Sequence, residues 1–207
     1  MKIKKEFFPY FEKAGRKQIY YPSDLIYMQE DEADLIYLII KGKVKVYVMN
    51  SNGKEVTMDI LQEGQIFGES AFITDAKRPT TIEALTHVEL LACYPTQLYP
   101  YFQQSQEFMV TIFQSLSQTC DYLTNTIKRS YTYNRYEKIL AFLLERMDFH
   151  QSSIINYTHE EIASILGLSR VTVTKVLNEF VKEGLIEIRY KSLIIKNKKK
   201  LYSLLYK

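Results

Sequence analysis

The residues best suited to binding chemistry in this sequence are basic and hydroxyl side chains in its last quarter. Thr158, three residues before Glu161, has the spacing of a capping box, which starts a helix. Ser169 suits the N-cap of a second helix. Only Gly167 and Leu168 separate the two helices, and this short turn is typical of a helix-turn-helix.

The second helix is expected to turn an apolar face inward at positions i, i+3, i+4 and i+7, which are Val173, Val176, Leu177 and Phe180. Arg170 and Val171 then lie in the exposed first turn, where an arginine can pair with guanine and a valine can pack on a thymine methyl. Thr174 and Lys175 are placed for phosphates or flanking bases. A hairpin pattern follows, with Lys191 at its tip. We therefore predict a winged helix-turn-helix that binds double-stranded DNA through Thr158, Ser169, Arg170, Val171, Thr174, Lys175 and Lys191.

The charge distribution agrees with this prediction. The net charge of the 207 residues is only +3, yet between Thr158 and Lys207 ten basic residues face five acidic ones. A basic segment on a slightly acidic body suits a polyanionic partner. A solvated lysine-rich tail would show the same bias, so charge alone leaves both interpretations open.

Metal and redox chemistry have little support in the sequence. Cys93 and Cys120 lie too far apart for a metal pair, and two thiols are too few for a four-thiolate iron–sulfur cluster. His87, His150 and His159 are scattered, which argues against a haem ligand or a cupin-like metalloenzyme. We expect no metal and no enzymatic activity; whether either cysteine has a redox role stays open.

Upstream, the hydrophobic pattern changes twice. Residues 2–14 have the pattern of a short amphipathic helix. Period-two alternation at residues 43–48 predicts a strand, and further strands are expected at residues 17–21, 25–28, 35–40, 55–61, 80–84 and 88–94. So many short strands predict a β-sandwich or barrel over about residues 15–95.

A stretch without Gly or Pro, residues 105–130, predicts one long helix with a narrow apolar seam, followed by a hinge near residues 130–134 and a second helix at 135–147. A helix of this length favours a homodimer interface made by Met109, Ile112, Leu116, Thr119, Leu123 and Ile127. A helix packed on its own domain is the alternative, and its first turns can pack there in either case.

The expected fold class is therefore α+β, with an effector-sensing domain at 1–103, a dimerisation helix and hinge at 104–132 and a winged helix-turn-helix at 133–207. No apolar run approaches the roughly 20 residues that cross a bilayer, so no membrane association is expected. The first eight residues lack the apolar core of a signal peptide, which makes the cytoplasm the expected compartment.

This order of elements resembles the Crp/Fnr family of transcription regulators over nearly the whole chain. Two segments carry the resemblance: Gly-Gln-Ile-Phe-Gly-Glu-Ser-Ala at 64–71 with Arg-Pro-Thr-Thr-Ile at 78–82, and Glu-Ile-Ala-Ser-Ile-Leu-Gly-Leu-Ser-Arg-Val-Thr-Val at 161–173. The resemblance implies a cyclic-nucleotide-binding-like β-roll (a double-stranded β-helix), a homodimer, a palindromic operator and RNA polymerase as a further candidate partner.

In the family's cyclic-nucleotide-binding members, a glutamate binds the ribose, an arginine pairs with the phosphate and backbone N–H groups face the anion. The matching segment, with the matching part of the long helix, gives a candidate effector site of Gly68, Glu69, Ser70, Ala71, Arg78, Thr80, Cys120 and Asp121. Pro79 lacks an N–H where those members have a serine, and Asp121 adds a negative charge, so both argue against cyclic AMP. An ion pair of Glu69 with Arg78 that only holds the segment is the alternative.

The resulting hypothesis is a two-state dimer in which a signal at the roll and long helix controls operator binding. Two other interpretations stay open: a cyclic-nucleotide-like module that regulates a partner protein, and a DNA-binding protein that needs no ligand. Val171 replaces the acidic residue of the cyclic-AMP-responsive members, so we expect a different half-site. The sequence does not determine the effector, the target genes or the sign of regulation.

Overall fold

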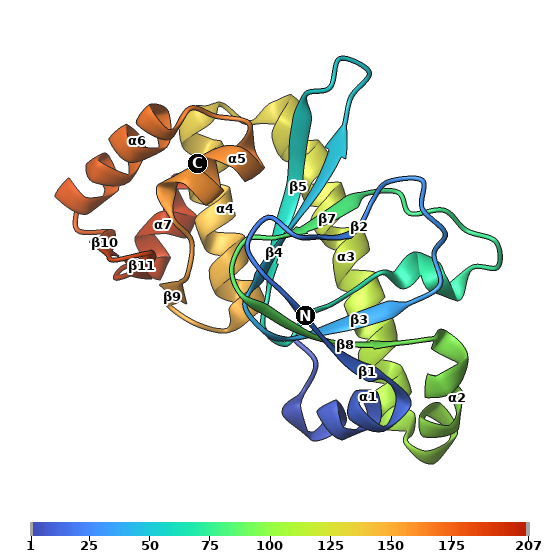
Figure 1. Ribbon diagram of the computed structural model, residues 1–207. Helices are drawn as coiled ribbons and strands as arrows, with labels where there is room; N and C mark the ends of the chain where they lie inside the picture. Colours follow the sequence, from blue (N-terminus) through green and yellow to red (C-terminus); the bar gives the residue numbers. More distant parts are fainter. Residues whose placement is uncertain (1, 206–207) are drawn as a thin grey trace. The chain divides into compact units, whose positions relative to one another are not determined.

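The computed structural model describes residues 2–205, and Figure 1 shows their path. The chain forms two compact units, Met1–Asp121 and Tyr122–Lys207, and the boundary between them falls inside the long helix α3 (Gln106–Thr132). A β-roll, a long helix and a winged helix-turn-helix follow one another, which confirms the predicted α+β fold. The division at residues 103 and 132 stays a prediction.

Two four-stranded antiparallel sheets form the roll, with strand orders β1-β8-β3-β6 and β2-β7-β4-β5. The strands are β1 (Arg16–Tyr20), β2 (Leu25–Tyr27), β3 (Ile36–Lys41), β4 (Lys43–Met49), β5 (Glu55–Gln62), β6 (Ile66–Phe67), β7 (Thr81–Ala84) and β8 (Val88–Cys93). All but β6 were predicted, and β6 was missed because two residues are too few to show an alternation.

Short helices flank the strands of the roll: η1 (Lys5–Phe7), α1 (Phe8–Ala14), η2 (Glu69–Phe72) and α2 (Pro95–Gln104). The single helix predicted at residues 2–14 is instead a 3-10 turn, η1, that leads into α1. The helix α2 was not predicted, because Pro100 inside it imitates a helix break.

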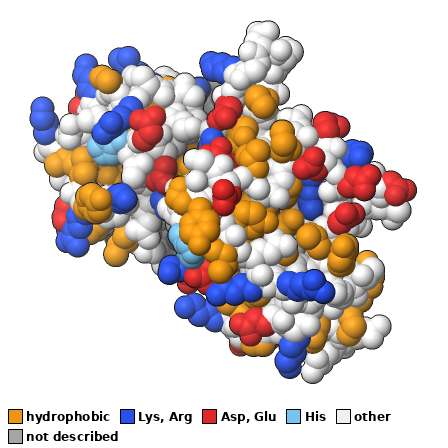
Figure 2. Space-filling view, viewed as in Figure 1, with side chains coloured by type: hydrophobic (Ala, Val, Ile, Leu, Met, Phe, Trp, Pro, Cys, Tyr) orange, Lys and Arg blue, Asp and Glu red, His pale blue; other side chains and the backbone are white. Residues whose placement is uncertain are grey.

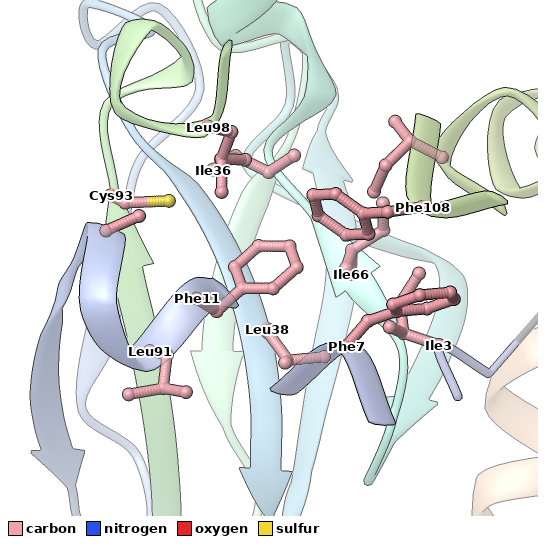
Figure 3. Packing of buried hydrophobic residues seen from close by; sticks show 12 residues of the cluster. Ile3, Phe7, Phe11, Ile36, Leu38, Ile66, Leu91, Cys93, Leu98 and Phe108 are labelled. Atoms are coloured by element: carbon pink, nitrogen blue, oxygen red, sulfur yellow. The ribbon is translucent and has the colours of Figure 1, made fainter. Parts of the chain in front are cut away.

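One hydrophobic cluster joins α1, the sheet β1-β8-β3-β6 and the first turns of α3 (Figure 3). Phe11, Leu38 and Phe108 come from these three elements and are each fully buried. Ile112, one turn after Phe108, is 4% exposed and belongs to the same cluster. This side chain therefore offers a second copy almost no surface, which agrees with packing of the first turns of α3 on their own domain.

Cys93 lies in the same cluster (Figure 3). Burial raises the pKa of its thiol to about 12, so the reactive thiolate is scarce at neutral pH. Cys120 is exposed on α3.

The second unit holds the last turns of α3, four further helices and a small sheet of order β10-β11-β9. Its elements are α4 (Arg135–His150), β9 (Ile154–Ile155), α5 (His159–Leu166), α6 (Arg170–Lys182), β10 (Ile186–Arg189), β11 (Ser192–Ile195) and α7 (Lys198–Leu205). The hairpin β10-β11 is the expected wing, while β9 and α7 were not predicted.

Two buried arginines attach the end of α3 to α4. Arg129 on α3 forms an ion pair with Glu145 on α4 and is 4% exposed. Arg146, 2% exposed, has its guanidinium carbon 4.8 Å from the ring centroid of Tyr122 and 5.4 Å from that of Tyr157. These contacts make residues 122–132 of α3 part of the winged unit.

Candidate nucleic-acid interface and effector segment

Side-chain caps start the two helices of the helix-turn-helix, and the cap of α5 is reciprocal. The Glu161 N–H donates to Thr158 Oγ1 at 3.1 Å, and the Thr158 N–H donates to Glu161 Oε2 at 2.7 Å. Gly167 ends α5 with a φ of +63°, a left-handed conformation that glycine adopts without strain. Ser169 caps α6 by accepting from the Thr172 N–H at 3.1 Å. Local sequence thus determines where both helices begin.

The two faces of α6 are as the sequence predicted. The inward residues Val173, Val176, Leu177 and Phe180 are all buried. On the outer face, Lys175 is exposed, the Arg170 side chain is 71% exposed and Val171 is 78% exposed. The first turn of α6 therefore presents one long cation and one apolar side chain together.

Three of the other predicted DNA-binding residues have hydroxyls that already bond within the protein. The hydroxyls of Thr158 and Ser169 serve the caps described above, and Thr174 Oγ1 lies 2.9 Å from Nδ1 of His159. Thr174 is half-buried, so the structure gives it an intramolecular partner. His159 was not among the predicted site residues, because a single histidine in a helix start carries no pattern.

Two hollows flank the start of α6. The first, which we call the basic hollow, has a volume of about 320 Å³ and is lined by Tyr157, Thr158, His159, Glu160, Arg170, Arg189, Lys191 and Ser192. The second, the Arg135 groove, has about 250 Å³ between Arg135 and Tyr136 of α4 and Val171, Thr172, Lys175, Val176 and Glu179 of α6. Figure 2 shows Lys and Arg side chains on the surface over this part of the molecule. Arg135 and Arg189 thus join the predicted cations only in the folded chain.

In the first unit, the predicted effector segment is held by Arg78. Its side chain is 2% exposed, and Nη2 donates to the Leu35 carbonyl at 2.8 Å. Nη1 donates to the Gly68 carbonyl at 3.1 Å and lies 3.4 Å from Ser70 Oγ. The guanidinium carbon lies 4.3 Å from the Tyr27 ring centroid. Nε is buried with no hydrogen-bond partner in the described part of the chain.

Aromatic rings pack beside this guanidinium. The rings of Tyr37 and Phe67 stack with centroids 4.9 Å apart, and Tyr27 lies within 6.0 Å of both. Thr80 and Ala71 are both half-buried, and Ala71 lies in the short helix η2. The interior of the roll at this point is therefore packed with side chains.

Glu69 begins η2, and burial raises the pKa of its carboxyl above the ordinary value. Backbone N–H groups of Gly68 and Glu69 oppose that rise. Between Glu69 and Arg78 the described structure has no ion pair within 4.0 Å, so Arg78 is held by carbonyls rather than by Glu69. Cys120 and Asp121, also predicted for this site, occupy exposed positions of α3.

Two family models match the chain. The cyclic nucleotide-binding domain matches residues 17–105, and the Crp-like helix-turn-helix domain matches residues 137–204. The chain belongs to the Crp/Fnr family. It is a DNA-binding transcription regulator of the Crp/Fnr type, and regulators of that family are not enzymes. Dimerisation and control by an effector are typical of the family.

Known Crp/Fnr regulators resemble this one over most of their length. The CRP-like cAMP-activated global transcriptional regulator of Mycobacterium tuberculosis is 26% identical over 184 residues, which covers 85% of this chain and 82% of that protein. The global nitrogen regulator of Synechocystis is also 26% identical, with 84% and 82% covered. Among solved structures, FixK2 of Bradyrhizobium japonicum superposes with a TM-score of 0.76 at 16% identity and coverages of 92% and 96%.

The effector segment of this Crp/Fnr regulator does not fit a cyclic phosphate in the arrangement observed. Both Nη atoms of Arg78 bind backbone carbonyls, and Pro79 offers no N–H. A phosphate that replaced these carbonyls would take the Arg78 donor from Leu35, at a cost of about 1–3 kcal/mol, whereas the Gly68 carbonyl would keep the Ala71 N–H at 3.0 Å.

The exposed apolar face of α3 differs from the predicted seam. Its largest exposed side chains are Val110, Phe113, Leu123, Ile127 and Tyr131, with Phe113 62% and Ile127 61% exposed. Of the predicted seam, Leu123, Ile127 and Thr119 are exposed, Met109 and Leu116 are half-buried, and Ile112 is buried. The apolar surface available to a second copy therefore includes Phe113 and Val110 near the start of α3 and Leu123, Ile127 and Tyr131 further along it, but not Ile112.

No helix among the described residues is long and apolar enough to span a membrane. No three His, Cys, Asp or Glu side chains among them come together as a metal site.

Proposed function

We propose that this regulator recognises its operator with Arg170 and Val171, which enter the major groove on the first turn of α6. The observation that carries the proposal is their exposure: a 78% exposed valine beside a 71% exposed arginine, on a helix whose opposite face is fully buried. Arginine supplies a bidentate contact to guanine and valine an apolar contact to a thymine methyl. Lys175 of α6 and Arg135 of α4 line the Arg135 groove, where they can neutralise DNA phosphates beside the major groove.

Two copies of the chain are proposed to pair through the exposed face of α3, which includes Phe113. Four or more large apolar side chains exposed along one helix are typical of an interaction surface. A symmetric pair would present two α6 helices about 34 Å apart, one turn of DNA, on an inverted repeat. Contact with RNA polymerase rests on the family resemblance alone.

Selection of bound sequences from random DNA tests this proposal directly. We expect an inverted repeat whose half-site centres lie about 10 base pairs apart, or a multiple of that spacing. Enrichment of a single, unrepeated half-site would contradict the dimer, and absence of any enrichment at low salt would contradict DNA recognition. That second result would favour a module that regulates a partner protein.

An Arg170→Ala variant should lose preference at one base-pair position and weaken binding to the selected operator by about 1–3 kcal/mol, or roughly 5- to 150-fold. Lys175→Ala should weaken binding to all sequences alike and reduce the salt dependence by about one released ion per half-site. Lys182, exposed at the far end of α6, provides the control, and Lys182→Ala should bind as the wild type does. Unchanged base preference in Arg170→Ala would refute the assigned role.

Cyclic AMP at millimolar concentration is expected to leave operator affinity unchanged, because Arg78 is already bound to carbonyl groups and the adjacent interior is packed with aromatic rings. Titration of the operator with and without the nucleotide measures this, with the cAMP-activated M. tuberculosis relative as the positive control. A gain in affinity would contradict this expectation and show that the nucleotide binds in spite of the carbonyl contacts of Arg78. If no metabolite tried changes operator affinity, a regulator that needs no ligand is favoured.

A further inference from the structure

The basic hollow brings together side chains from three separate elements of the winged unit. His159 lies at the start of α5, Arg170 at the start of α6, and Arg189 and Lys191 at the tip of the wing. A volume of about 320 Å³ exceeds that of several waters, each of which takes about 30 Å³ in the liquid. The hollow can therefore admit a phosphodiester group with its hydration.

His159 is held at the wall of the basic hollow by one ring nitrogen. Nδ1 lies 2.9 Å from Thr174 Oγ1, and the side chain is half-buried. Nε2, on the opposite side of the ring, has no hydrogen-bond partner in the described part of the chain, so it is the atom available to a ligand. A protonated imidazole has two N–H donors, one for Thr174 and one for an anion.

The charged groups around His159 are mostly cationic. Arg170 faces it from α6, and Arg189 and Lys191 face it from the wing. Glu160 is the acidic residue of the lining; it is 72% exposed, and its Oε2 lies 4.0 Å from Arg170 Nε. Arg189 Nε also donates to Glu187 at 2.6 Å. An entering phosphate would thus meet three cations and one exposed, solvated carboxylate.

We propose that the basic hollow binds a DNA phosphodiester and that His159 takes up a proton from the solvent when the phosphate enters, so that operator binding is coupled to proton uptake at each half-site. This inference rests on the proposed DNA recognition by α6 and adds a ligand and a pH response to it. In the bound state, Nδ1–H donates to Thr174 and Nε2–H donates to a phosphate oxygen.

The direction of the pH response follows from the electrostatics. In the free protein, burial and the positive charge of Arg170 hold the pKa of His159 below its ordinary value, so the ring is neutral at pH 7. A bound phosphate neutralises the surrounding cations and raises the pKa of His159 in the complex. Affinity therefore rises as pH falls through the pKa of the complex, and it stops rising below the pKa of the free protein.

The test measures operator affinity between pH 6 and pH 8 at constant ionic strength, with the duplex selected by the wild-type protein. Each engaged His159 adds up to about tenfold in affinity per pH unit. A His159→Gln variant can still hydrogen-bond Thr174 and phosphate but does not titrate, so its profile should be flat. His87, exposed on the roll, provides the matched control: His87→Gln should keep the wild-type slope.

A second measurement locates the phosphate. Single neutral methylphosphonates placed along the operator should reveal one position per half-site that removes the pH dependence in the wild type and has no such effect in His159→Gln. Equal slopes for the wild type and His159→Gln would overturn the inference while DNA recognition stands. Failure of the wild type to bind any selected duplex at any pH would instead overturn the proposed function.

Discussion

A Phe113→Asp variant is expected to be monomeric and to lose at least 100-fold in affinity for the full operator. Phe113 is 62% exposed on the apolar face of α3, and in a symmetric pair the new carboxylate would be introduced twice at the interface. The free-energy cost of burying two unpaired carboxylates exceeds the favourable free energy that the apolar contacts of such an interface supply. Loss of the second half-site removes about 10²–10⁴ in avidity. Light scattering coupled to chromatography, with operator titration, measures both effects.

Gln114 provides a control on the same helix, about 100° around the axis from Phe113. It is exposed, and Gln114→Asp should remain dimeric and bind the operator. Because Phe113 makes no contribution to the fully buried core of the roll, circular dichroism of the Phe113 variant should match that of the wild type. A dimeric Phe113→Asp protein would show that another face of the chain makes the dimer.

An Arg78→Ala variant should unfold with a free energy about 3–5 kcal/mol below that of the wild type. The change takes the Arg78 donor from the half-buried Leu35 carbonyl, at about 1–3 kcal/mol, and one of two donors from the Gly68 carbonyl, at about 0.5–1.5 kcal/mol, and it removes the cation over the Tyr27 ring, at up to about 2 kcal/mol. Arg78→Lys should recover only part of the loss, because one ammonium cannot reach both carbonyls with the fork of a guanidinium. Urea unfolding of the full-length protein measures the difference.

Arg16, exposed at the start of β1, is the matched control, and Arg16→Ala should change stability by less than about 0.5 kcal/mol. A wild-type unfolding curve for Arg78→Ala would mean that Arg78 is kept for a ligand rather than for the fold. In that case, the same variant should lose the response to an anionic effector.

Where the fold depends on local periodicity, the sequence was sufficient. The alternation of most strands, the reciprocal cap of Thr158 with Glu161 and the inward face of α6 are all patterns within a few residues, and the structure reproduces them. The strand β6 and the helix α2 were missed, because two residues show no period and Pro100 interrupts a helical pattern. No local rule could correct either omission.

By itself, the sequence determined the order of elements, the family and the exposed pair Arg170 and Val171, since each of these depends on short-range spacing. The tertiary structure alone decided which side of α3 is buried, because Phe108 and Ile112 had to meet Phe11 and Leu38 from distant parts of the chain. It also decided that the Arg78 side chain donates hydrogen bonds to the backbone carbonyls of Leu35 and Gly68. The basic hollow around His159 exists for the same reason: its cations lie 11–32 positions further along the chain and become neighbours only when the wing folds back beside α5.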